Sequence, residues 1–87
     1  MYRGEFKDIK AVFHDVKEEI RAKEQEMLTY DLPENCTLVV EVVDNASGYL
    51  EIAVEKHDEN GMTLESATDD YDCADEVLWA MIENAVY

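Results

Sequence analysis

The sequence predicts an α+β fold in which a three-stranded antiparallel meander is covered by a long N-terminal helix and a C-terminal helix. Apolar residues recur at helical spacing near both ends of the chain, and apolar and polar residues alternate in three segments between them. The alternating segments are joined by two five-residue turns that each end in glycine. The expected order is α-β-β-β-α in a two-layer sandwich, formed by one small acidic domain that covers residues 1–87.

The first element is predicted to be one amphipathic helix over residues 5–29. Its apolar stripe repeats at spacings of three, four and seven residues and consists of Phe6, Ile9, Phe13, Val16, Ile20 and Met27, widened by Val12 and Leu28. Pro33 ends the helix, because the residue before a proline is pushed out of the helical region.

Three strands are expected next, and their apolar residues should face the helices. Residues 37–43 direct Leu38, Val40 and Val42 to that face, and residues 49–56 direct Leu50, Ile52 and Val54 to it. The third strand begins at residue 62 and sets Met62 and Leu64 against Thr63 and Glu65.

Residues 68–72 are predicted to be a charged loop that leads into a helix over residues 73–86. Asp72 is a suitable N-cap, and acidic residues in the first turn suit the helix dipole. The expected buried stripe is Ala74, Val77, Leu78, Met81, Ile82 and Ala85. Trp79 lies at its border, which favours packing against the core over a role as an interface anchor.

Charge is distributed unevenly along the chain, whose net charge is −15. Residues 1–29 carry seven acidic side chains and six Lys and Arg, whereas the rest carries fifteen acidic side chains and one basic residue, Lys56. Net charge governs solubility and association and does not select a fold, so this asymmetry points to the protein's partners.

The sheet face turned away from the helices is expected to carry Glu41, Glu51, Glu55 and Glu65, together with the apolar Val39, Val43 and Ala53. To a basic groove, such an array of carboxylates resembles a phosphate backbone. The predicted partner-binding residues are Glu41, Glu51, Glu55, Glu65, Asp69, Asp70, Tyr71, Asp72, Asp75, Glu76 and Glu83.

Catalytic, cofactor and metal sites are not predicted. His14 and His57 have no carboxylate or cysteine at a ligand or triad spacing. The acidic segments 58–65 and 69–76 do not match the calcium-binding loop of an EF-hand. We therefore expect a non-catalytic protein without a cofactor.

The two cysteines, Cys36 and Cys73, do not form a CxxC pair, which favours reduced thiols in a cytoplasm, and a single disulfide bridge stays open as the alternative. No apolar run is long enough to span a membrane, and MYRGEFKDIK shows no secretory signal.

In size, charge and layout the chain is similar to the phage-encoded inhibitors of host defence, the anti-CRISPR and anti-restriction proteins, without aligned residues. The likeness implies a DNA mimic that acts in the host cytoplasm on a basic nucleic-acid-binding protein, a nuclease such as a CRISPR effector or a restriction enzyme. Direct binding to nucleic acid or membrane is not expected. The nearly neutral N-terminal helix is assigned to the scaffold or to a homodimer contact. The element order is also that of double-stranded-RNA-binding domains, but those use basic loops.

Three alternatives remain. A small immunity or interaction protein would use its acidity to neutralise one specific basic toxin or subunit. An acidic accessory subunit would have no inhibitory role. Salt adaptation would explain the acidity without any partner, although six basic residues gathered in the first 29 argue against a pressure that acts along the whole chain.

Overall fold

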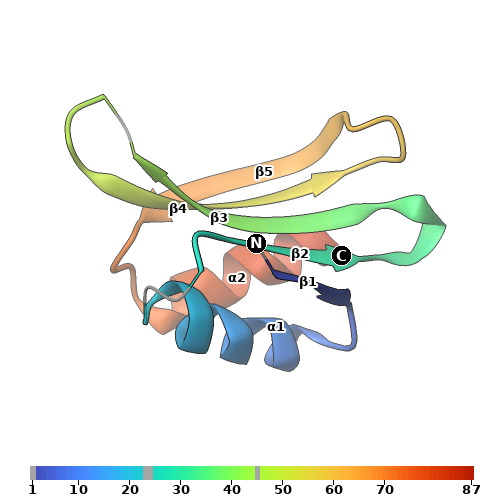
Figure 1. Ribbon diagram of the computed structural model, residues 1–87, viewed down its shortest axis with the longest axis horizontal. Coiled ribbons are helices and arrows are strands. Elements are labelled where there is room, and N and C mark those ends of the chain that lie inside the picture. The colour runs from blue at the N-terminus through green and yellow to red at the C-terminus, as the bar shows by residue number, and fades with distance from the viewer. Residues whose placement is uncertain (1, 23–24, 45) are drawn as a thin grey trace.

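The structure, a computed structural model, describes residues 2–22, 25–44 and 46–87. Its elements in chain order are β1 (Tyr2–Glu5), α1 (Ile9–Asp15), the π-helical turn η1 (Val16–Ile20), β2 (Met27–Asp31), the 3-10 turn η2 (Pro33–Asn35), β3 (Thr37–Asp44), β4 (Leu50–His57), β5 (Thr63–Asp70) and α2 (Asp75–Val86). The strands form one five-stranded sheet in the order β1-β2-β3-β4-β5, and both helices lie on the same side of it, below the sheet in Figure 1. The α+β class is confirmed, while the three-stranded sheet is wrong.

The long N-terminal helix is also wrong, because its helical part covers residues 9–20 and strands flank it on both sides. Asp8 has extended backbone angles, and its side chain accepts a hydrogen bond from the Ala11 amide at 2.7 Å, so it caps α1. Within η1, the Arg21 amide donates to the Val16 carbonyl, five residues back, at 3.0 Å. The predicted stripe holds inside these limits, where the buried residues are Ile9, Val12, Val16 and Ile20.

β2 takes the place of the expected last turns of that helix. Leu28 and Tyr30 are buried, whereas Met27 and Thr29, which alternate with them, are half-buried, and this is the two-residue period of a strand. β2 pairs antiparallel with β3 over five positions, and β1 pairs with β2 in parallel. Pairing with neighbours thus overrides a local pattern that fits both a helix and a strand.

The antiparallel meander is confirmed in β3 and β4, whose bounds lie within one residue of those expected. Its turns contain Gly48 and Gly61 at φ 85° and φ 82°, a region that side chains with a Cβ rarely adopt. In the second turn the Asp58 carboxylate accepts hydrogen bonds from the amides of Asn60 and Met62 at 2.8 and 3.0 Å.

β5 differs from the prediction in both length and orientation. A register shift at Lys56 and His57 reverses its faces, so Ala67 lies opposite Val54 on the side of the core. Met62 and Leu64, which were expected in the core, are 67% and 51% exposed. The loop expected at residues 68–72 is correspondingly shorter, because β5 extends to Asp70.

α2 begins two residues later than predicted. Ala74 occupies the N-cap position and makes no side-chain cap hydrogen bond, so the prediction that Asp72 caps the helix is wrong. Asp75 and Glu76 do lie in the first turn. The buried residues are Leu78, Met81, Ile82 and Ala85, while Val77 is 37% exposed.

The core lies between the helices and one face of the sheet, where apolar residues of α1, η1 and α2 meet those of β2, β3 and β4. Cys36 is buried and Cys73 half-buried, and both are free thiols. Within the described parts of the chain, no helix has both the length and the apolar character needed to cross a bilayer.

Candidate functional site

The sheet face opposite the helices, here termed the open face, carries the candidate site. The pairing register assigns alternate residues of β2 to β5 to it. These residues are Met27, Thr29 and Asp31 of β2, Thr37, Val39, Glu41 and Val43 of β3, Glu51, Ala53, Glu55 and His57 of β4, and Thr63, Ser66, Thr68 and Asp70 of β5, where the register shift separates Thr63 from the other three. The described strands β2 to β5 thus place five carboxylates on the open face, and none of its residues in those four strands is Lys or Arg.

A small apolar floor lies at the centre of the open face. Val39 is 7% exposed and Ala53 is 1% exposed, although α1 and α2 both lie on the other side of the sheet. Glu55 is directly opposite Val39, and Glu41 is directly opposite Ala53. The longer side chains around the floor therefore shield it from water, and Glu41 and Glu55 are half-buried in turn.

Two carboxylates of the open face lie directly across a strand pair, because Glu51 is opposite Asp70. Side chains in such positions have Cβ atoms about 5 Å apart, and like charges there destabilise the sheet. Further along β4, His57 Nε2 lies 2.7 Å from Glu55 Oε1, so one carboxylate of the face has an imidazole partner within the chain.

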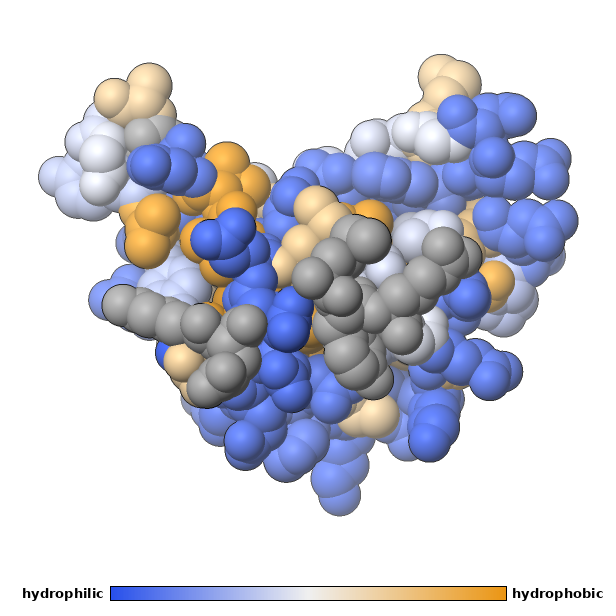
Figure 2. Space-filling model, in the orientation of Figure 1, coloured by the Kyte–Doolittle hydropathy of each residue, from blue (hydrophilic) through white to orange (hydrophobic). Residues whose placement is uncertain are grey.

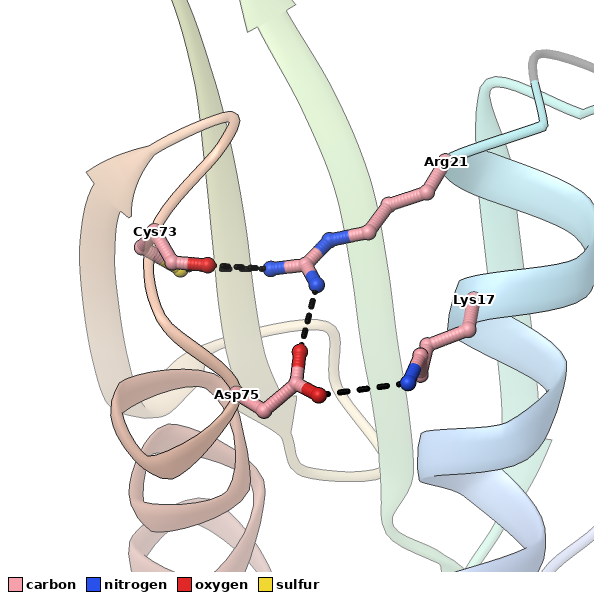
Figure 3. Close-up of polar contacts among 4 residues, drawn as sticks. All are labelled: Lys17, Arg21, Cys73 and Asp75. Atoms are coloured by element: carbon pink, nitrogen blue, oxygen red, sulfur yellow. Dashed lines mark hydrogen bonds and ion pairs between the residues drawn. The ribbon is translucent and has the colours of Figure 1, made fainter.

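Asp75 belongs to a different cluster, which joins η1 to α2 (Figure 3). Arg21 Nη1 donates to Asp75 Oδ1 at 2.8 Å, and Lys17 Nζ donates to Asp75 Oδ2 at 3.2 Å. These hydrogen bonds, from Arg21 first and then Lys17, lower the pKa of the Asp75 carboxyl below its ordinary value. Asp75 was predicted to bind a partner, but two cations of the same chain already hold its carboxylate.

The guanidinium of Arg21 makes a second set of contacts in this cluster. Its Nη2 donates to the Cys73 carbonyl at 2.6 Å and lies 3.7 Å from Cys73 Sγ. Burial raises the pKa of the Cys73 thiol, and the nearby Arg21 charge opposes the rise. The cluster therefore fixes the segment before α2 as well as the helix itself.

The predicted partner-binding residues do not form one surface. Glu41, Glu51, Glu55 and Asp70 share the open face. Glu65 lies opposite Lys56 and Asp69 opposite Ile52, which turns both toward the helices, so the placement of Glu65 on the open face is wrong. Tyr71 and Asp72 follow β5 in a turn, and Asp75, Glu76 and Glu83 belong to α2 in the helical layer.

Asp31 is a member of the open face that the sequence interpretation missed. It was placed beyond the end of a helix, whereas β2 sets it directly opposite Thr37 of β3. The alternation of Leu28, Tyr30 and Leu32 was the signal that could have revealed this strand.

Among the residues that the structure describes, no three His, Cys, Asp or Glu side chains are grouped so that they could hold a metal ion. Comparisons with protein-family models, with curated protein sequences and with solved structures find no match. The geometry and charge of the surface are therefore what indicates the function of this protein.

Proposed function

We propose that this protein is a non-catalytic acidic inhibitor that mimics DNA and occupies the basic nucleic-acid groove of a defence nuclease, such as a CRISPR effector or a restriction enzyme. The observation that supports the proposal is the open face, where five carboxylates gather on four adjacent strands and none of the described helices covers them. The inhibitor would act in the cytoplasm of the host cell.

The spacing of the carboxylates suits such a groove. Glu51 and Glu55 are four residues apart on β4, which is about 13 Å along the strand, and paired strands are about 4.8 Å apart. Duplex DNA carries about one negative charge per 1.7 Å of its axis, and proteins hold that backbone with Lys and Arg before they read its sequence. An open sheet face with anionic groups several ångströms apart presents a comparable target to those cations.

The remaining acidic residues contribute to the proposed function at longer range. A net charge of −15 steers the protein toward a positively charged groove and raises the association rate. Glu76 and Glu83 lie on the exposed side of α2, away from the open face, and belong to this group. Asp75 does not, because Lys17 and Arg21 already neutralise its charge.

We assign no reaction to the open face. Carboxylates act as an acid and a base when a pocket separates their pKa values. Here they stand on a sheet surface without a covering element, which suits docking better than acid–base chemistry.

A second candidate is an immunity or interaction protein that neutralises a specific basic toxin or subunit. The observation that favours it lies on α2, where Val77 is 37% exposed and Trp79 is 36% exposed between Glu76 and Glu83. Trp79 packs edge-on against Phe13, with ring centroids 5.3 Å apart, and its exposed part within an acidic rim resembles the anchor of a protein interface. Such a partner would use the helical layer instead of the open face.

Competition with DNA tests the first proposal. A purified CRISPR effector or restriction enzyme is bound to a fluorescent DNA duplex, and displacement of the duplex is measured at several salt concentrations. The triple variant Glu41→Gln/Glu55→Gln/Asp70→Asn should displace DNA at least about tenfold less well, because charge pairs at an interface are strongly coupled.

The matched control Glu59→Gln/Glu76→Gln/Glu83→Gln removes the same number of charges outside the open face. Its ability to displace DNA should fall by no more than about twofold, because only the long-range electrostatic steering is weakened. Equal losses in the two triple variants would reject the assignment of the open face. Thermal melting of both variants shows that they remain folded.

Capture from the lysate of a bacterium with active restriction and CRISPR systems separates the two candidates. A nuclease released by rising salt and by duplex DNA supports mimicry, because DNA competes for the same groove and salt weakens the charges. A partner that neither treatment releases, and that a Trp79→Ala variant fails to capture, supports the second candidate.

A further inference from the structure

A pocket opens where the β3–β4 hairpin leaves the body of the protein. It has a volume of about 250 Å³ and is lined by Ile20, Gln25, Glu26, Val42, Leu50 and Tyr71. Val42 and Leu50 point to the helical side of the sheet. The pocket therefore lies near the end of the sheet on its helical side, and not on the open face. No part of the proposed DNA mimicry uses it.

Tyr71 forms a fixed wall of this pocket. Its hydroxyl donates a hydrogen bond to the Ile20 carbonyl at 2.8 Å, which ties it to the end of η1. Its amide donates to the Leu50 carbonyl at 3.1 Å, which ties it to the start of β4. The wall is therefore held in place before any partner arrives, and binding there loses little conformational entropy.

Exposed apolar side chains extend the pocket along the hairpin. Tyr49 is 69% exposed and Leu50 is 44% exposed. Both line a second, wider hollow that is also lined by Tyr71, Asp70 and Asp72. Figure 2 shows hydrophobic residues gathered at the base of the projecting β3–β4 hairpin, with hydrophilic residues around them.

The rim of this apolar area is acidic. Glu26 lines the pocket itself, and Asp70 and Asp72 line the adjoining hollow. Asp44 is directly opposite Leu50 at the base of the hairpin. An apolar centre with these acidic side chains around it favours a partner of opposite charge.

The size of the pocket also limits its occupant. Pockets for small molecules usually measure about 300–1,000 Å³, and this pocket is smaller, although the adjoining hollow of about 550 Å³ lies within that range. A volume of about 250 Å³ suits one or two side chains of a protein.

We propose that the pocket binds an extended basic segment of the target protein, with one Leu-like or aromatic side chain in the pocket and Lys or Arg side chains on the acidic rim. The inference rests on the proposed function and deepens it, because a basic groove that accepts the open face would also present such a segment at its border. The apolar contact would supply the residence time and specificity that exposed charges alone lack.

The probe is a synthetic peptide of Lys and Arg with a single central Leu. The same peptide with Ala at the centre is the control. Binding is measured in about 0.15 M salt, where the Debye length of about 8 Å weakens non-specific attraction. The Leu peptide should bind about tenfold more tightly than the Ala peptide, because binding in the pocket removes the apolar surface of the Leu side chain from water. Amide chemical shifts should change most at Val42, Leu50 and Tyr71.

Two pairs of variants provide matched controls on the protein. Leu50→Ser and Tyr49→Ala should remove the preference for the Leu peptide. Leu64→Ser and Met62→Ala, which change side chains of similar exposure at the opposite end of the meander, should retain it. All four residues are at least 44% exposed, so none of these changes opens a cavity in the core.

Equal affinity for the two peptides, or shifts confined to the open face, would overturn the inference. It would also fail if Leu50→Ser abolished self-association, since the occupant would then be a second copy of this chain. If the wild-type protein binds the Leu peptide but displaces no DNA, the proposed function is rejected and peptide binding by the pocket is retained. If the wild-type protein and the Leu50→Ser variant displace DNA equally well, the inference about the pocket is rejected and the proposed function is retained.

Discussion

Arg21 and Asp75 join the two helical segments of this protein across 54 residues of sequence, with Arg21 Nη1 and Asp75 Oδ1 2.8 Å apart. Lys17 reaches the other oxygen of the same carboxylate at 3.2 Å (Figure 3). Two of the basic residues in the first third of the chain therefore hold α2 in place. They neutralise Asp75 of α2, and the carboxylates of the strands stay available for a partner.

The ion pair predicts a pH-dependent loss of stability in an Asp75→Asn variant. The pKa of Asp75 is lowered in the folded state, so its contribution is fully present above the ordinary carboxyl value of 3.8 and is lost as the pH falls through the lower folded value. Urea unfolding at several pH values should show wild type more stable than the variant at neutral pH, with the gap closing in acid. A gap that stays constant down to the acid limit would contradict this assignment. The effect should be modest, because the Asp75 side chain is 51% exposed.

Arg21 should matter more than Asp75, because its side chain is 21% exposed and also donates to the Cys73 carbonyl. An Arg21→Met variant should lose about 2 kcal/mol of unfolding free energy, since hydrogen bonds from a charged group contribute about 1.5–3 kcal/mol. Arg21→Lys should restore little, because a single ammonium lacks the planar fork that reaches both acceptors. Denaturant titration of the three proteins checks this, and full recovery with Lys would show that charge alone is needed.

The identity of β2 can be tested with two adjacent residues. Leu28 is fully buried and Met27 is half-buried on the open face. Leu28→Ala should lower the free energy of unfolding by about 3 kcal/mol, as buried Leu-to-Ala changes usually do. Met27→Ala should lower the free energy of unfolding by less than about 1 kcal/mol, since its side chain is only partly buried. Similar losses at the two positions would argue for the helix that the apolar spacing first indicated.

Charge repulsion on the open face predicts that salt stabilises this protein. Raising the salt concentration screens Glu51 from Asp70 and the acidic surface as a whole, so the melting temperature should rise. Asp70→Asn removes one charge from the directly opposed pair and should stabilise the protein by about 0.5 kcal/mol at low salt.

The gain from Asp70→Asn should shrink at high salt, where the repulsion is already screened. Glu59→Gln in the β4–β5 turn is the control, because it removes a charge without relieving an opposed pair. A melting temperature that does not respond to salt would mean that the repulsion is neutralised within the chain.

Local patterns predicted those elements whose signals are long or unambiguous. The strict alternation around Val40 and Ile52, with glycine turns beside it, predicted β3 and β4 almost to the residue. The stripe from Ile9 to Ile20 predicted a helix there. The predicted element boundaries were wrong in β2, where a short apolar run fits both the helical and the strand period. They were also wrong where strands pair in parallel across a long stretch of sequence, as β1 and β2 do.

The candidate site shows the same division. Glu41, Glu51 and Glu55 were placed correctly on one face, because strands β3 and β4 were correct. Glu65 was misplaced because a one-residue register shift turns every following side chain to the other face. The ion pairs of Asp75 could not be predicted, because its cations come from a segment far away in the sequence.

The sequence by itself determined that this is a small α+β protein with a net charge of −15 carried almost entirely beyond the first third of the chain. Composition and short-range periodicity are properties of the chain alone, so they can be read without a structure. The tertiary structure decided which carboxylates share the open face, which one is consumed by an internal ion pair, and where Leu50 and Tyr71 form a pocket. These features depend on strand register and on contacts between distant segments, which the whole fold selects by burying one apolar face of the sheet.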